Sequence, residues 1–103
     1  MSDPIEVDYW KSNGLVKPQS IVVCAAIRVG GVIFCGARHC DSVMHTQADA
    51  ANMSLQLGEQ GFINQFGEFL SREEAMKVVK EARQPFNIER NRGDTVLFSE
   101  GLY

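Results

Sequence analysis

The stretch IVVCAAIRVGGVIFCGARH, residues 21–39, decides the fold. It holds two apolar runs of β type on either side of Gly30-Gly31, and a Gly-Gly centre is typical of the two-residue loop of a β-hairpin. With these glycines as the loop, Val29 pairs with Val32. The register of both strands follows from that single pair.

The hairpin is apolar on both sides. Successive strand residues face opposite ways, so one face carries Cys24, Ala26, Arg28, Ile33, Cys35 and Ala37, and the other carries Val23, Ala25, Ile27, Phe34 and Arg38. An antiparallel sheet with one side in water alternates apolar and polar residues instead. We expect helices of the chain to cover one face, and a second copy to cover the other, because 103 residues leave little else to do so.

A helix and a second hairpin are predicted next. Asp41 is a suitable N-cap for a helix that runs to about Leu55, because apolar residues recur at helical spacing, namely Met44, Ala48, Ala51 and Leu55. Gly58 ends this helix. A second, shorter hairpin is predicted to turn at Phe66-Gly67.

The last part of the chain completes an α+β domain. Ser71 and Glu74 have the spacing of a capping box, which starts a helix to about Arg83 that buries Ala75, Val78 or Val79, and Ala82. NIERNRGD (87–94) is predicted to be a polar loop, and TVLF (95–98) a final strand. The order β-β-α-β-β-α-β describes an antiparallel sheet of two hairpins plus a C-terminal strand, packed with two helices.

Composition sets the limits of this domain. With 103 residues, 45% of them hydrophobic and 22% charged, the chain is one globular unit and a second domain is excluded. Residues 1–20 are predicted to be an N-terminal arm, with Tyr9 and Trp10 packing on the domain or on a neighbouring subunit, and residues 21–103 the domain.

Charge and targeting signals narrow the partners and the location. A net charge of −3 argues against DNA or RNA polymers, although a few local arginines can still bind a small phosphate-bearing ligand. The apolar runs fall short of the roughly 18 residues of a membrane span. The start MSDPIEVDYW does not have the form of a signal peptide. We expect a soluble protein in the reducing cytoplasm.

The arginines are the main candidates for ligand binding, because guanidinium groups bind phosphate and stack on bases. Each lies where an element ends or in a loop, and the candidate set is Arg28, Arg38, Arg72, Arg90 and Arg92. Surface ion pairs are the alternative for each one. Phe62 is the preferred aromatic for stacking a base, because Gly61 beside it allows close approach; the alternative is a place in the core.

No enzyme or metal site is predicted. The spacing Cys35-x3-His39-Cys40-x4-His45 lacks the paired geometry of zinc sites. A Cys40 nucleophile with His39 as its base requires two adjacent side chains to meet. We expect no cofactor, and a small hydrolase built on these two residues is the least favoured of the readings.

Five blocks of the chain resemble a known family: CAAIR (24–28), CGARH (35–39), EQGF (59–62), the region 66–75 and LFSEGLY (97–103). Together they resemble the Thoeris anti-defence type 1 family of small phage-encoded proteins, known as sponges. The resemblance implies a non-catalytic protein that sequesters cyclic ADP-ribose isomers of the glycocyclic class. Some members also hold cyclic trinucleotides.

The resemblance also implies a site and an assembly. Members form dimers, and in some cases hexamers, with the cyclic ADP-ribose pocket between subunits. By block, the family's pocket residues correspond to Phe62, Ser71 and Arg28, with Arg90 or Arg92 as a further arginine. His39, in the second block, joins the candidate set. The family usually has Asn at the position of Ser71, which leaves the preferred isomer open.

A second hypothesis belongs to another class. The same apolar surface would serve a protein–protein inhibitor or adaptor that blocks a host defence protein. This hypothesis predicts no small-molecule ligand, and it is favoured if Arg28, Phe62 and the late arginines scatter instead of converging on one pocket.

Overall fold

The Gly30-Gly31 hairpin is present in the computed structural model, which describes residues 12–102. Strands β1 (Val22–Val29) and β2 (Val32–Gly36) are antiparallel, and Val29 lies opposite Val32. Gly30 has a φ of 59°, in the left-handed region that glycine enters without a steric penalty. The predicted turn and register are confirmed.

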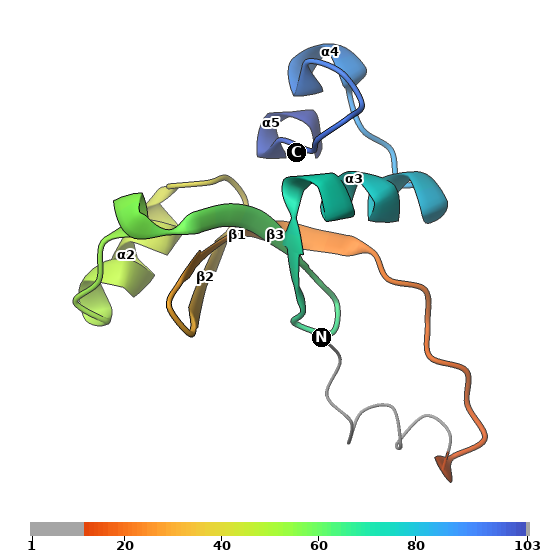
Figure 1. Cartoon of the computed structure of the whole chain (residues 1–103), viewed down its shortest axis with the longest axis horizontal. Coiled ribbons are helices and arrows are strands. Elements are labelled where there is room, and N and C mark those ends of the chain that lie inside the picture. The colour runs from red at the N-terminus through yellow and green to blue at the C-terminus, as the bar shows by residue number, and fades with distance from the viewer. Residues whose placement is uncertain (1–11, 103) are drawn as a thin grey trace.

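A second hairpin extends the sheet to four strands. β3 (Glu59–Asn64) and β4 (Phe69–Ser71) complete the order β2-β1-β3-β4, with every neighbouring pair antiparallel (Figure 1). The predicted turn at Phe66-Gly67 is confirmed, with Gly67 at a φ of 76°. The Asn64 side chain stabilises it by accepting hydrogen bonds from the amides of Phe66 and Glu68, each at 3.0 Å.

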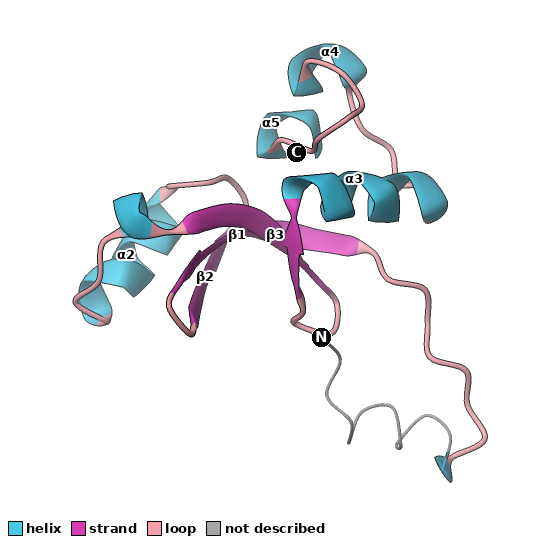
Figure 2. Cartoon of the chain, viewed as in Figure 1, coloured by secondary structure: helices cyan, strands magenta, loops and turns pink. Residues whose placement is uncertain are grey.

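Helices accompany this sheet (Figure 2): α2 (Ser42–Ala50), α3 (Arg72–Glu81), α4 (Ile88–Asn91) and α5 (Ser99–Leu102), with a short 3-10 turn at Leu55–Leu57. Both predicted helix starts are confirmed. Asp41 accepts a hydrogen bond from the Met44 amide at 2.9 Å, and Ser71 and Glu74 form both bonds of a capping box. α3 runs along one side of the sheet, with α4 and α5 beyond it (Figure 1).

The first helix ends earlier than predicted. α2 stops at Ala50, because Asn52 takes a left-handed conformation (φ 54°) and the Met53 amide returns to the Ala48 carbonyl at 3.0 Å. Ala51 is therefore exposed, contrary to prediction. Leu55 is buried as predicted, although it reaches the core from the 3-10 turn.

The C-terminal segment differs from the predicted loop and strand. Part of NIERNRGD forms α4, and TVLF forms no strand. The cause is Asn91, whose buried amide donates to the Gly93 and Val96 carbonyls at 2.8 Å and accepts from the Phe98 amide at 2.7 Å. These bonds use backbone groups that a fifth strand would need, so residues 12–102 form a four-stranded sheet.

One face of the sheet carries the core. Its cluster joins both longer helices to the sheet and consists of Val22, Ala25, Ile27, Phe34, Met44, Ala48, Leu55, Phe62, Ala75, Met76, Val79 and Leu97. Val23 was predicted on this face. A β-bulge between Val22 and Cys24 turns it outward, so Val23 is 44% exposed while Val22 is 4% exposed.

None of the helices within residues 12–102 packs on the opposite face, and we call it the open face. Its partly exposed side chains are Cys24, Ile33, Cys35, Ile63 and Phe69. Burial raises the pKa of Cys24 to about 11, and the neighbouring Cys35 adds to this effect. Cys24 is therefore a neutral thiol at pH 7.

Glutamine side chains complete the backbone hydrogen bonding where no strand lies alongside. Gln47 of α2 accepts from the Cys35 amide at 2.9 Å and donates to the Cys35 carbonyl at 2.7 Å. Gln84 does the same for Val22, at 2.7 and 3.0 Å. Each amide imitates one residue of a neighbouring strand, which closes the sheet at that point.

The described part of the predicted arm leads into β1. Residues 15–21 have no regular secondary structure, and Gln65 holds them by donating to the Gln19 carbonyl at 2.7 Å and accepting from the Ile21 amide at 2.8 Å. Before this anchor, Val16 is 92% exposed. The predicted packing of Tyr9 and Trp10 lies outside the described residues.

Candidate functional site

Two of the predicted arginines line one cavity beside α4 and α5. It has a volume of about 230 Å³ and is lined by Arg90, Arg92, Phe98 and Glu100. Arg90 belongs to α4 and Arg92 is its C-cap, while Phe98 directly precedes α5 and Glu100 lies in its first turn. Two short helices therefore bring cationic, aromatic and anionic groups to one place.

Local packing fixes these two helices against each other. Asn87 caps α4 by accepting from the Arg90 amide at 2.9 Å, and its own amide donates to the Gly101 carbonyl at 2.7 Å. A Cβ at Gly101 would lie 2.4 Å from the Cβ of Asn91, so only glycine allows this approach. The residues that line the cavity are therefore held in place by the hydrogen bonds and close packing between α4 and α5.

Arg92 is held in a costly backbone conformation. Its φ of 60° lies in the left-handed region, where a helix C-terminus usually has glycine. A residue with a Cβ loses about 1 kcal/mol there. Strain of this kind is concentrated at functional sites, and here it falls on an arginine of the cavity.

Arg72 extends the same site from the first turn of α3. Its guanidinium lies 4.9 Å from the centre of the Phe98 ring and donates a hydrogen bond to Gln60 of β3. Among residues 12–102, its buried Nε atom has no hydrogen-bond partner, and neither has the buried hydroxyl of Ser99, which lies between the lining residues Phe98 and Glu100.

His39 approaches this group from the loop after β2. Its Nε2 donates to the Gly61 carbonyl at 2.7 Å, and its ring meets Phe62 edge-on at 5.1 Å. Burial lowers its pKa, and the positive charge of Arg72 acts in the same direction, while the Gly61 carbonyl and Glu100 oppose the shift. His39 is thus a neutral imidazole within electrostatic reach of both Arg72 and Glu100.

Phe62 differs from its predicted role, whereas Ser71 has the capping role that the sequence predicted. Phe62 is fully buried in the core, so neither face of its ring is available to a base. The aromatic ring at the cavity is Phe98. The Ser71 hydroxyl accepts from the Glu74 amide at 3.1 Å, which makes it the capping group of α3.

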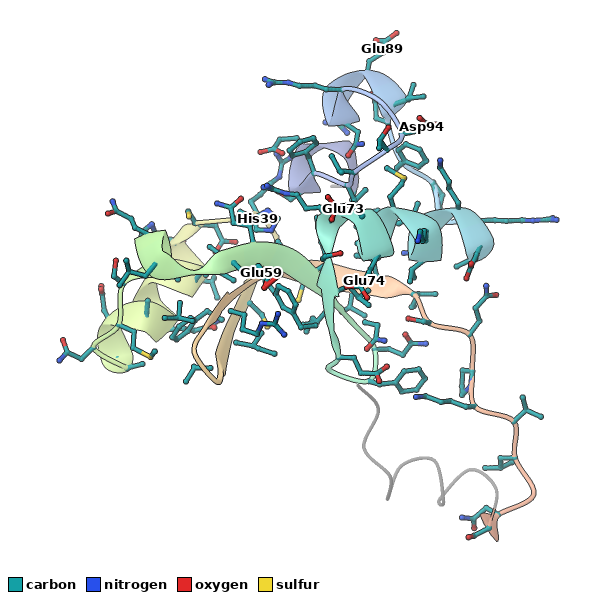
Figure 3. All side chains as sticks on the ribbon, viewed as in Figure 1. His39, Glu59, Glu73, Glu74, Glu89 and Asp94 are labelled. Carbon is teal, nitrogen blue, oxygen red and sulfur yellow. The ribbon has the colours of Figure 1, made fainter. Side chains whose placement is uncertain are left out.

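Arg28 and Arg38 lie apart from the cavity arginines. Arg28 is on the open face, where it pairs with Glu59 at 2.7 Å and lies 4.3 Å from the centre of the Phe69 ring. Figure 3 shows Glu59 and His39 on opposite sides of the sheet. Arg38 was predicted to end the second strand, but β2 stops at Gly36 and Arg38 lies in the following turn, where its amide donates to Asp41.

The predicted cysteine and histidine residues do not form a cluster among the described residues. Within residues 12–102, no group of three or more His, Cys, Asp or Glu side chains could hold a metal ion. Cys40 is exposed, and no hydrogen bond joins it to the His39 ring in the described part of the chain. No helix among the described residues is long and apolar enough to cross a membrane.

Three residues of the site were not predicted: Gln60, Phe98 and Glu100. The last two lie in LFSEGLY, one of the blocks that carries the family resemblance: Phe98 is the last residue of the predicted strand TVLF, and Glu100 follows it two residues later. The usable signal was Asn91, an amide between two arginines. Its side chain accepts a hydrogen bond from the Phe98 amide, which ties Phe98 to α4.

Fold and site together define a small α+β protein with an arginine-lined cavity beside a four-stranded antiparallel sheet. The chain matches the phage T4 y16D protein family over residues 21–103, and it belongs to that family. Comparison with curated proteins and with solved structures gives no significant match.

Proposed function

We propose that this phage protein binds a small phosphate-bearing nucleotide at the cavity of Arg90 and Arg92 and holds it without chemical change. The supporting observation is that the arginines at this cavity are not neutralised by acidic side chains of the described residues. Within residues 12–102, neither arginine forms a side-chain hydrogen bond or ion pair, and Arg72 has no carboxylate partner. Three such guanidinium groups in a protein of net charge −3 favour a phosphate ligand.

The proposed ligand is a cyclic ADP-ribose-type immune signal, and the proposed role is to act as a phage anti-defence sponge. This step rests on the resemblance to the Thoeris anti-defence type 1 family, because the description of the y16D family names no ligand. Phe98 provides an aromatic surface for a base. The site of action would be the cytoplasm of the infected host, and cyclic trinucleotides are a further ligand to test.

We further propose that the protein works as a homodimer or a larger homo-oligomer such as a hexamer. A cavity of about 230 Å³ is smaller than the roughly 300–1,000 Å³ of typical ligand sites. A second copy placed over the open face would bury its apolar residues, and the Arg28 of that copy could complete a site. Light scattering on the purified chain tests this assembly.

Calorimetry against cyclic ADP-ribose isomers and cyclic di- and trinucleotides tests the ligand. We expect one member of this panel to bind, and heating the complex to release the same molecule unaltered. A folded protein that binds nothing in the panel would refute the proposal. Recovery of a cleaved product would instead show an enzyme.

The second candidate is a protein–protein inhibitor that uses the open face against a host defence protein. One observation favours it, because Arg28 and Phe62 do not converge with the late arginines within the subunit. It predicts a stable heterocomplex in a pull-down and no small-molecule ligand. Variants of Arg90 and Arg92 would leave such a complex intact.

A further inference from the structure

Among the residues that the structure describes, Glu100 is the one acid that lines the arginine cavity. Its carboxylate makes no ion pair with Arg90 or Arg92 and no side-chain hydrogen bond to any residue between 12 and 102. A carboxylate close to free guanidinium groups would normally pair with them. The cavity therefore presents exposed charges of both signs that are not paired with one another.

A site for phosphate alone would not contain this group. A carboxylate repels every phosphate oxygen and only accepts hydrogen bonds when ionised. It can be satisfied by the donors of a ligand, and the two vicinal hydroxyls of a ribose match its two oxygens. The same logic places an acid on the ribose in dinucleotide-binding folds.

The order of groups in the cavity fits a ligand with distinct ends. Arg90 and Arg92 offer donors to phosphate, Phe98 offers a ring face, and Glu100 offers acceptors. A nucleotide presents acceptors on its phosphate, an aromatic base, and donors on its sugar. Inorganic phosphate or pyrophosphate matches only the arginines.

We propose that Glu100 determines specificity by accepting hydrogen bonds from the ribose hydroxyls of the ligand while it repels phosphates that carry no sugar. This inference rests on the proposed function and names the chemistry of one part of that site. Discrimination of this kind combines attraction for the right ligand with repulsion of the wrong one. Ligands without the hydroxyl donors would leave the carboxylate unpaired.

The test compares two probes, cyclic ADP-ribose and inorganic pyrophosphate, by calorimetry on the full chain. In Glu100→Gln we expect the affinity for cyclic ADP-ribose to fall about tenfold. The affinity for pyrophosphate should rise severalfold, because the repulsion is gone. The two affinities therefore move in opposite directions.

Glu89→Gln is the matched control. It removes the same charge from the same pair of short helices, but Glu89 points away from α5 at the outer side of α4 (Figure 3). Its two affinities should change by less than twofold. Thermal unfolding of both variants confirms that they are folded, and Glu100→Ala replaces Glu100→Gln if the latter is not.

The outcomes separate the two proposals. If both affinities rise together, or neither changes, Glu100 does not accept hydrogen bonds from the ribose hydroxyls. This inference then fails, while the proposal of nucleotide binding stands. If the unmodified chain binds neither probe nor any member of the nucleotide panel, the proposed function fails and the inference falls with it.

Discussion

Two regions of the molecule each place an arginine over a phenylalanine ring, and they differ in what surrounds the charge. On the open face, Arg28 lies 4.3 Å from the centre of the Phe69 ring and is neutralised by Glu59 at 2.7 Å. At the cavity, Arg72 lies 4.9 Å from the centre of the Phe98 ring, and within residues 12–102 it has no acidic partner and its buried Nε is unpaired. The two pairs consist of the same residue types, and they differ in whether the arginine has an acidic partner.

The largest expected difference between the two regions is in ligand affinity. Arg72→Ala removes a charge-assisted contact and should weaken binding of cyclic ADP-ribose by roughly 10- to 100-fold. Arg28→Ala should change it by less than about threefold, because its charge is already paired. Calorimetry on both variants measures this. A larger loss in Arg28→Ala would show that a second copy brings its open face to the cavity.

A substitution at Gly61 should disturb the Arg28–Phe69 pair of the open face. A Cβ at Gly61 would lie 2.2 Å from the Leu70 carbonyl oxygen and 2.6 Å from the Phe69 ring. Gly61→Ala should therefore lower the free energy of unfolding by about 1–3 kcal/mol in urea denaturation. Part of this loss should disappear in a Phe69→Ala background, where the ring is absent. If the free-energy changes of Gly61→Ala and Phe69→Ala were strictly additive, the Phe69 ring would not be the source of the clash.

The cavity region should gain stability when its strained arginine is replaced. Arg92→Gly relieves the left-handed backbone and should raise the free energy of unfolding by about 0.5–1 kcal/mol. It should also weaken ligand binding about tenfold, because a phosphate contact is lost. Arg92→Ala is the control, with the same loss of affinity and no gain in stability. A destabilised Arg92→Gly would show that the side chain, not the strain, dominates.

Protonation should affect the cavity region through His39. An anion bound nearby raises the lowered pKa of this imidazole, so binding takes up a proton, and affinity for cyclic ADP-ribose should increase a fewfold from pH 8 to pH 6. His39→Gln, whose Nε2 can still donate to Gly61, should remove the trend. A pH profile shared by the wild type and His39→Gln would place the titrating group elsewhere.

The unliganded chain should respond to pH in the opposite sense. The pKa of His39 in the folded state lies below its ordinary value of 6.5, so the unfolded state takes up the proton first. The free energy of unfolding should therefore fall as the pH drops below about 6.5. Urea denaturation between pH 8 and pH 5 measures this contribution, which His39→Gln should abolish.

The smallest expected effect is on the exposed ion pair. Glu59→Gln removes the partner of Arg28, whose side chain is 43% exposed, and should change the free energy of unfolding by less than about 1 kcal/mol. Added salt should reduce even that difference. A loss that persists at high salt would mean that the Arg28–Phe69 pair depends on the carboxylate for its position.

Much of the sheet could be predicted because its determinants are local. Gly30-Gly31 sets the register of the first hairpin, and the Ser71–Glu74 capping box starts α3; both act within a few residues. The bulge at Val23 could not be predicted, because it depends on pairing with a strand about 40 residues later. TVLF has strand composition, but Asn91 takes its backbone groups.

The sequence predicted the charged residues of the candidate site but not how the fold brings them together. Arg72 was predicted at the start of a helix, Arg90 and Arg92 in a loop, and His39 within a block of the family resemblance; the structure brings all four to one region. Phe62 was placed wrongly, because an aromatic residue beside glycine has the same local pattern whether it faces the core or a ligand. Only the packing of α4 against α5 shows that Phe98 is the ring at the cavity.

The hydrogen bonds between Gln84 and the β1 backbone make one amide a measure of how α3 is docked on the sheet. Gln84 lies just beyond α3, yet it holds both backbone groups of Val22, 62 residues earlier in the chain. The Val22 amide is therefore protected from hydrogen exchange only while the end of α3 is docked on the sheet. Its exchange rate would follow the opening of that helix without unfolding of the hairpin, and Gln84→Ala would make the amide exchange freely while the rest of β1 stays protected.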